Sequence, residues 1–174
     1  MLSAMNVAKF FINLFKDTEE GVTNMKLQKL LYFAQGISFQ RFDAALFPDE
    51  IEAWDFGPVV NNVYQKYKSY DREPIRDSED IPVSADEESL LLDVAREYGK
   101  YTTWTLVDMT HKKGSPWAEC YIEGQNHTVI PKSTIRAYFR DIERPVTGIN
   151  WDELISMSTV VDLTGDNTIS SEDW

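Results

Sequence analysis

The sequence predicts a mainly α-helical fold: a compact, single multi-helix domain with at most a short β element, followed by an acidic C-terminal extension. Apolar residues recur at helical spacing along most of the chain. The 43% hydrophobic content of the 174 residues is sufficient for a core. Residues 145–174 contain six acids and no Lys or Arg. We therefore expect a helical domain over residues 1–144 and an extension over residues 145–174.

The first two expected helices have clear starts. Ser3 is the N-cap of the first, whose apolar stripe begins at Ala4 and ends at Phe15. Thr23 or Asn24 caps the second, which runs to about Phe42 and is apolar nearly all round, as is typical of a central, buried helix. Gly36 within it costs about 1 kcal/mol of helix propensity relative to Ala. We expect another helix to cross closely there and offset that cost.

A short two-stranded β element is expected next, with an extended piece around residues 51–54 and a turn at Gly57. Pro58 suits the first position of a third helix, because its missing N–H is not needed there. Residues 69–83 lose periodicity and gain prolines and acids, which predicts an exposed loop. Ser84 and Glu87 match a capping box that opens a fourth helix, and Gly99 stands at its expected end.

Three shorter helices complete the expected domain. One starts at Thr102 or Thr103 and stops at Gly114, and Ser115-Pro116-Trp117 starts a further turn of helix. The last begins at Pro131 or Ser133 and ends before the proline at 145. The pattern thus alternates helices with short connections, without an internal repeat.

The net charge of −12 is concentrated in two segments. Residues 71–88 hold eight acids and two bases, and residues 145–174 carry the rest of the excess, so the remaining body is neutral. Nucleic-acid affinity depends on Lys and Arg neutralising phosphates, so this balance argues against a nucleic-acid partner. It favours a basic protein partner.

The residue inventory offers little for catalysis or cofactors. Cys120 could form a thiolate–imidazole pair with His111 or His127, but neither a glycine-rich elbow nor an orienting carboxylate lies nearby in the sequence. One Cys and two His leave a four-ligand zinc site incomplete, and no glycine-rich loop could hold a phosphate. We expect no catalytic residue, no cofactor and no enzymatic activity.

A weak calcium-loop pattern stands at the end of the chain. Its oxygen ligands would be Asp162, Thr164, Asp166, Ser170 and Asp173, with an apolar Ile169 at the eighth position. An asparagine replaces the usual glycine, and aspartate replaces the usual glutamate at the last position. A solvated acidic end is the alternative, and we expect no metal site.

The chain shows no secretory signal and no apolar run long enough for a membrane span. Its single cysteine excludes an internal disulfide and fits a reducing compartment. These features predict a cytoplasmic protein.

Three segments carry the strongest pattern: LQKLLYFAQ at 27–35, EAWDFGPVV at 52–60, and LVDMTH at 106–111, followed by Pro116-Trp117. Leu, Phe and Trp in these segments can form a core. The polar residues Lys26, Gln28 and Lys29 on an apolar helix need water, a partner or a buried hydrogen bond. They are either structural polar contacts or part of a recognition surface.

In the order and spacing of these segments, residues 4–143 resemble the Panacea domain of the SocA-like antitoxin family, which includes phage-associated GepA-type proteins. The following residues match family positions and are candidates for partner binding or for defining the fold: Lys26, Gln28, Lys29, Tyr32, Trp54, Gly57, Pro58, Tyr64, Thr110, His111 and Trp117.

The resemblance implies a helical, non-catalytic antitoxin that neutralises a protein toxin encoded nearby by binding it directly. Two alternatives remain open: an adaptor that delivers the toxin to a Clp-type protease, and a phage or mobile-element module that blocks a host protein. The acidic segment 71–88 and the extension are the first candidates for the contact surface.

Overall fold

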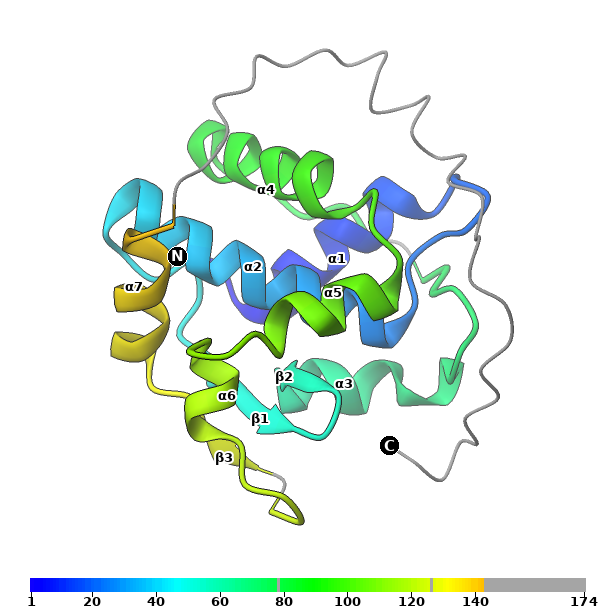
Figure 1. The fold of residues 1–174 in the computed structure, drawn as a ribbon. Helices are drawn as coiled ribbons and strands as arrows, with labels where there is room; N and C mark the ends of the chain where they lie inside the picture. The colour runs from blue at the N-terminus through cyan, green and yellow to red at the C-terminus, as the bar shows by residue number, and fades with distance from the viewer. Residues whose placement is uncertain (78, 126, 143–174) are drawn as a thin grey trace.

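Helix α2 (Asn24–Phe42) runs through the middle of the computed structural model, which describes residues 1–77, 79–125 and 127–142 (Figure 1). Helices α1 (Ala4–Phe15), α4 (Ala85–Tyr98), α5 (Thr103–Thr110) and α7 (Lys132–Arg140) pack around it. Every α2 side chain from Lys26 to Phe39 is buried. The predicted mainly α fold and the central position of this helix are confirmed.

The predicted starts of α1, α2 and α4 are also confirmed. The Ser3 hydroxyl accepts the Asn6 N–H at 3.1 Å, and Thr23 caps α2 in the same way. Ser84 and Glu87 form a reciprocal capping box at the start of α4. These bonds satisfy N–H groups that have no acceptor within their own helix.

Gly36 is the point where α7 approaches α2 most tightly. A Cβ atom at this position would lie 2.4 Å from the ring of Phe139, a distance that the packing cannot accommodate. The Phe139 ring is almost fully buried and also makes an edge contact with Tyr32. The expected close crossing at Gly36 is therefore present.

A small antiparallel sheet lies at one end of α2. Strands β1 (Glu52–Trp54) and β2 (Gly57–Val59) form a hairpin in which Trp54 pairs with Gly57. Strand β3 (Thr128–Val129) adds to the other edge of β1, giving the order β2-β1-β3. The third strand is an addition to the two-stranded element that the sequence predicted.

The prediction that Pro58 starts the third helix is wrong. Pro58 lies within β2, and α3 (Asn61–Tyr67) begins after Val60. An edge strand tolerates a residue without an N–H. Gly57, with φ of +106°, sets the chain direction that places Pro58 in the hairpin.

The connections also differ in detail from the expectation. A 3₁₀ turn (Lys68–Tyr70) follows α3. The loop beyond it is mostly exposed as predicted, but Ile75 is fully buried and its N–H donates to the Val22 carbonyl at 2.9 Å. Helix α5 ends at Thr110 rather than at Gly114. The Ser115 hydroxyl donates to the Thr110 carbonyl and caps the short α6 (Pro116–Cys120).

The expected boundary between residues 144 and 145 and the calcium-loop pattern both lie outside the described residues. Among the helices that are described, none combines the length and apolar character required to span a membrane.

Candidate functional site

Most residues of the sequence pattern lie at the β1–β2 hairpin or on the helices beneath it. Tyr64 and His111 are half-buried. The others are buried: Lys26, Gln28, Lys29, Tyr32, Trp54, Gly57, Pro58, Thr110 and Trp117. Tyr32 lies apart from the hairpin, against Phe139, and Lys26 lies at the start of α2. The other buried polar side chains, Gln28, Lys29 and Thr110, lie directly beneath the hairpin. We call these three residues the platform.

Gln28 joins α2 to the end of the hairpin. Its Oε1 accepts the Val60 N–H at 2.9 Å, and its Nε2 donates to the Asn24 Oδ1 at 3.0 Å. Asn24 in turn donates to the Tyr64 carbonyl at 3.1 Å. This chain of buried hydrogen bonds sets the position where β2 ends and α3 begins.

Lys29 lies directly beneath Gly57. Its side chain is fully buried, and its ammonium group donates to the Pro58 carbonyl at 3.3 Å. No carboxylate forms an ion pair with it among the described residues. Burial therefore lowers the pKa of Lys29 to about 7.

Gly57 is required where it stands for two reasons. Its positive φ is a conformation that L residues rarely adopt. A Cβ atom there would also lie 2.8 Å from Lys29 Cε and 2.9 Å from the Thr110 Oγ1. The hairpin, α2 and α5 meet at this glycine.

Aromatic stacking holds the hairpin from the side of α6. The Trp117 Nε1 donates to the Trp54 carbonyl at 2.8 Å. His111 stacks on one face of Trp117, with ring centroids 3.6 Å apart, and Tyr121 stacks at 4.5 Å. Burial, and next the Lys29 ammonium, lower the pKa of His111. The imidazole is therefore neutral at pH 7.

Further aromatic side chains gather around the same hairpin, some of them buried and some at the surface. Trp54 contacts the rings of Tyr64 and His127 at 4.9 Å, and Phe56 contacts Trp104 at 5.8 Å. Trp104 keeps 42% of its surface exposed. We call this set the hairpin cluster, and its members are Trp54, Phe56, Tyr64, Trp104, His111, Trp117, Tyr121 and His127.

Two acids lie within the hairpin cluster. The Glu52 carboxylate accepts hydrogen bonds from Trp54 Nε1 at 2.8 Å and contacts His127 Nδ1 at 2.7 Å. Asp55, at the exposed hairpin turn, accepts from the Tyr121 hydroxyl at 2.8 Å. The cluster thus presents aromatic rings beside carboxylates. The sequence patterns did not single out Trp104, Tyr121 or His127 for this surface. The one signal in the sequence was a tryptophan, Trp104, in the first turn of an expected helix.

The structure does not activate Cys120. Burial, and next the Glu119 carboxylate, raise the pKa of its thiol, which opposes thiolate formation. His111 is stacked on Trp117 and His127 contacts Glu52, and neither has a hydrogen bond to Cys120 within the described residues. Nor do the residues that the structure describes bring three metal-ligating side chains together.

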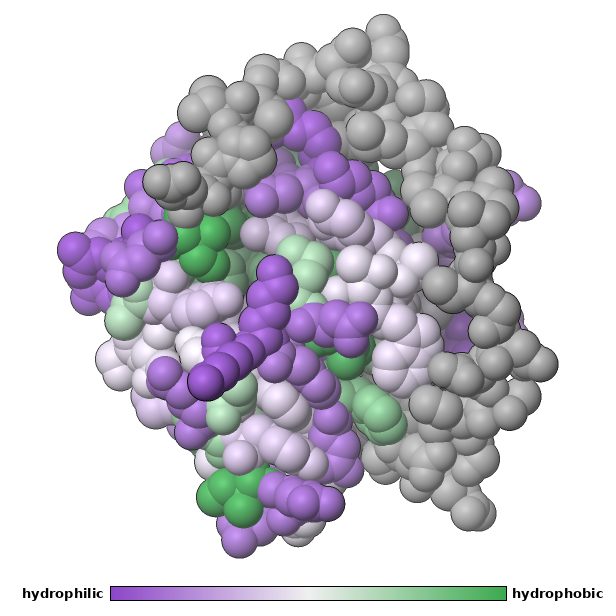
Figure 2. All heavy atoms as spheres, viewed as in Figure 1, coloured by the Kyte–Doolittle hydropathy of each residue, from purple (hydrophilic) through white to green (hydrophobic). Residues whose placement is uncertain are grey.

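In the acidic segment 71–88, as in the hairpin cluster, some carboxylates already have partners within the protein. Glu79 pairs with Lys9, and Glu87 belongs to the capping box of α4. Asp71, Glu73, Asp77 and Asp80 are exposed and form no ion pair within the described part of the chain. Figure 2 shows that the face over α4, α5 and α6 is largely hydrophilic or intermediate, with apolar residues as separate spots rather than one patch.

Comparison with known proteins gives one family. The model described as antitoxin SocA-like, Panacea domain, matches residues 27–118, more than half of the chain. This confirms the family resemblance predicted from the sequence. The matched residues begin in α2 and end in α6, so they include the hairpin and the platform beneath it. Neither the curated proteins nor the solved structures contain a significant match.

Proposed function

Because the chain belongs to the antitoxin SocA-like, Panacea domain family, we propose that it neutralises a protein toxin encoded nearby by binding it directly and covering its working surface. The hairpin cluster is the centre of the proposed contact surface. To bind a toxin tightly, this surface must be rigid, rich in aromatic groups and complementary in charge to the toxin.

The observation that carries the proposal is the combination of exposed and half-buried aromatic rings, with Trp104 the most exposed tryptophan among them, and a buried polar platform. Trp and Tyr are the residues that most often dominate binding energy in protein interfaces. Gln28 and Lys29 hold the hairpin from below, so its rings are positioned before the partner arrives. Preorganised side chains lose less entropy on association, which favours tight binding.

Charge supports a basic partner. Asp55 and Glu52 lie within the hairpin cluster, and the free carboxylates of segment 71–88 add negative potential elsewhere on the surface. An acidic surface of this kind accelerates encounter with a basic protein and loses that effect as salt rises.

A growth-rescue experiment tests the proposal. The full chain is co-expressed with the product of the neighbouring gene, and complex formation is measured with the purified proteins. We expect rescue of growth and a soluble complex. Trp104→Ser should weaken the complex by about tenfold or more, as expected for the loss of an interface aromatic residue.

Phe42→Ser is the matched control. Phe42 and Trp104 are each 42% exposed, but Phe42 lies at the far end of α2. We expect the complex to tolerate this variant. Equal binding by the Trp104 and Phe42 variants would place the contact surface elsewhere, and absence of both rescue and binding would refute direct neutralisation.

The lifetime of the toxin separates occlusion from delivery to a protease. Occlusion predicts an unchanged toxin half-life when Clp-type proteases are removed from the host, whereas an adaptor predicts a longer one. Cys120→Ser should retain full rescue, because the proposed mechanism uses no nucleophile. Loss of rescue in that variant, with the fold intact, would favour an enzymatic mechanism.

A further inference from the structure

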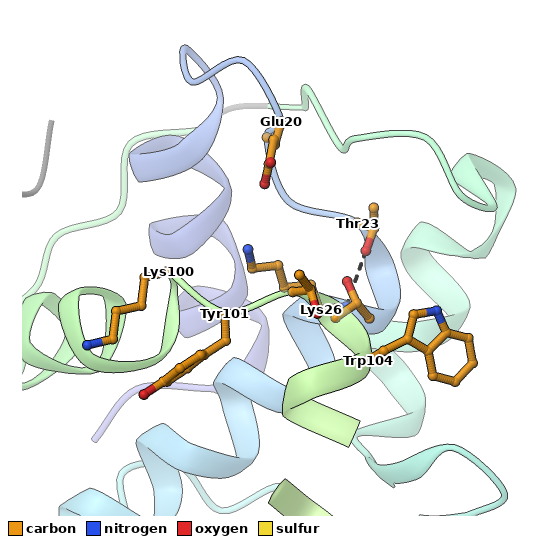
Figure 3. A pocket seen from close by; sticks show the side chains of 9 residues that line it. Glu20, Thr23, Lys26, Lys100, Tyr101 and Trp104 are labelled. Carbon is orange, nitrogen blue, oxygen red and sulfur yellow. Dashed lines mark hydrogen bonds between the residues drawn. The ribbon is translucent and has the colours of Figure 1, made fainter. Parts of the chain in front are cut away.

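A pocket of about 260 Å³ lies where the starts of α2 and α5 meet. Figure 3 shows its principal side chains: Glu20, Thr23, Lys26, Lys100, Tyr101 and Trp104. The pocket is separate from the platform under the hairpin, although Trp104 belongs to both its wall and the hairpin cluster.

Lys26 is the unusual residue of this pocket. Its side chain is only 7% exposed, and its ammonium group forms no hydrogen bond or ion pair with any described residue. In Figure 3 the amine end of Lys26 points into the space below Glu20. Burial lowers the pKa of Lys26, and the Glu20 carboxylate only partly opposes this effect. The ammonium lies at the wall of the pocket, largely removed from water and without a close partner, which is costly, and an anion in the pocket would reduce that cost.

Two helix N-termini add to the positive potential. The pocket is lined by Thr23 and by Thr102, the N-cap residues of α2 and α5. Each cap hydroxyl accepts one N–H of its helix, from Lys26 and from Thr105 respectively. The remaining first-turn N–H groups have no acceptor within a helix and carry the positive end of its dipole. The first-turn N–H groups of α2 and of α5 therefore both favour binding of an anion in this pocket.

The charges and the walls specify the kind of anion. Two lysines and one glutamate give the lining a net charge of about +1, which suits a singly charged group better than a dianion such as phosphate. The Lys100 ammonium lies 5.3 Å from the Tyr101 ring centroid. Tyr101 and Trp104 offer aromatic surface for an organic body attached to the anion.

We propose that this pocket binds a carboxylate attached to a small organic body, with Lys26 as the charged contact and the starts of α2 and α5 as N–H donors. The carboxylate belongs either to a free small acid or to the C-terminus of a polypeptide, which share this chemistry. The proposal rests on the pocket alone and does not depend on the proposed antitoxin function.

An NMR titration of the full chain tests the proposal. The probes are N-acetylphenylalanine, its neutral amide, inorganic phosphate, and the peptide N-acetyl-Gly-Gly-Phe with a free C-terminus. We expect N-acetylphenylalanine to shift the amide signals of Asn24, Met25, Thr103 and Trp104 saturably at millimolar concentration, and the amide and phosphate to bind far more weakly. Tighter binding of the peptide would identify a polypeptide C-terminus as the source, and equal binding would identify a free acid.

Three variants complete the test. Lys26→Met should weaken binding by about tenfold, the effect of losing one charge-assisted hydrogen bond. The exposed Lys113→Met serves as its control and should bind normally. Glu20→Gln should strengthen binding several-fold, which a merely misfolded variant cannot do. Unchanged binding in the Lys26 and Glu20 variants, equal binding of the neutral amide, or no saturable shifts would overturn the proposal.

Discussion

Lys26 and Lys29 lie three residues apart on α2, and both are buried, but their surroundings differ. The Lys29 ammonium is fully enclosed beneath the hairpin and donates to the Pro58 carbonyl. The Lys26 ammonium has no hydrogen-bond partner in the described residues and faces a pocket. Burial lowers the pKa of both side chains.

These different surroundings give the two lysines different roles. Lys29 serves the fold, because its long side chain fills the space under Gly57 and its ammonium satisfies a buried carbonyl. The Lys26 ammonium bonds to no group among the described residues, and an anion in the pocket is its proposed partner. Substitutions should therefore damage the region around Lys29 and spare the fold around Lys26.

The largest expected effect is at Gly57. Gly57→Ala should lower the free energy of unfolding by about 3 kcal/mol or more, because the new Cβ collides with Lys29 and Thr110 and the positive φ is strained. Urea denaturation measures this. Gly114→Ala is the control, since Gly114 also has positive φ but no atom within 4 Å of the added Cβ. Equal losses in the two variants would show that strain alone, and not the contact with Lys29, makes Gly57 necessary.

The next effect is the pH dependence due to Lys29. In the unfolded chain Lys29 stays protonated up to its ordinary pKa of 10.5, whereas in the folded chain it loses its proton at about pH 7. Between these values the unfolded chain binds more protons, so stability rises with pH. We expect the margin in stability between the native chain and Lys29→Met to shift by about 2 kcal/mol in favour of the native chain between pH 7 and pH 9. A margin that does not change with pH would mean that Lys29 has an ordinary pKa.

A loss of stability of similar size is expected at Gln28, from unpaired hydrogen-bonding groups rather than from a change of charge. Gln28→Met leaves the Val60 N–H and the Asn24 Oδ1 without their partner and should cost about 2 kcal/mol in thermal or urea unfolding. Gln65→Met on the exposed face of α3 should change stability by less than about 0.5 kcal/mol. A Gln28 variant as stable as the Gln65 variant would indicate that water replaces the lost bonds.

The smallest expected effect on stability is at Lys26. Lys26→Met keeps the apolar stem and removes an unpaired charge, so unfolding should change by less than about 1 kcal/mol, in the stabilising direction. Thermal or urea unfolding of the Lys26→Met variant measures this change in stability. A loss of stability as large as that at Gln28 would assign Lys26 to the fold and end the distinction between the two lysines.

Periodicity and capping residues predicted the helical parts because those signals are local. Ser3, Thr23 and the Ser84–Glu87 box each act within four residues, and α2 reveals its burial by being apolar all round. The prediction failed at Pro58, where local preference for a helix start lost to pairing with β1 and to the hydrogen bond between Gln28 and Val60. The strand Thr128–Val129 forms only by pairing with Glu52 and Ala53 of β1, which are far away in the sequence. No local pattern therefore predicted it.

The candidate surface shows the same limit. The family pattern named Trp54, Tyr64, His111 and Trp117. Only their packing shows that they gather around one hairpin, together with Trp104 and Tyr121. The sequence also named Lys26 and Lys29 together, as polar residues on an apolar helix, without distinguishing their roles. Their environments come from different elements: the hairpin covers Lys29, and the start of α5 lies beside Lys26.

The amino-acid sequence by itself determined the family, the helical class, the central helix and the helix caps, because each follows from neighbouring residues or from a pattern along the chain. Only the tertiary structure decided which lysine side chain lies beneath the hairpin and which faces a pocket. That distinction depends on what distant segments place around each ammonium group, and burial energies are set by these surroundings rather than by the residue type.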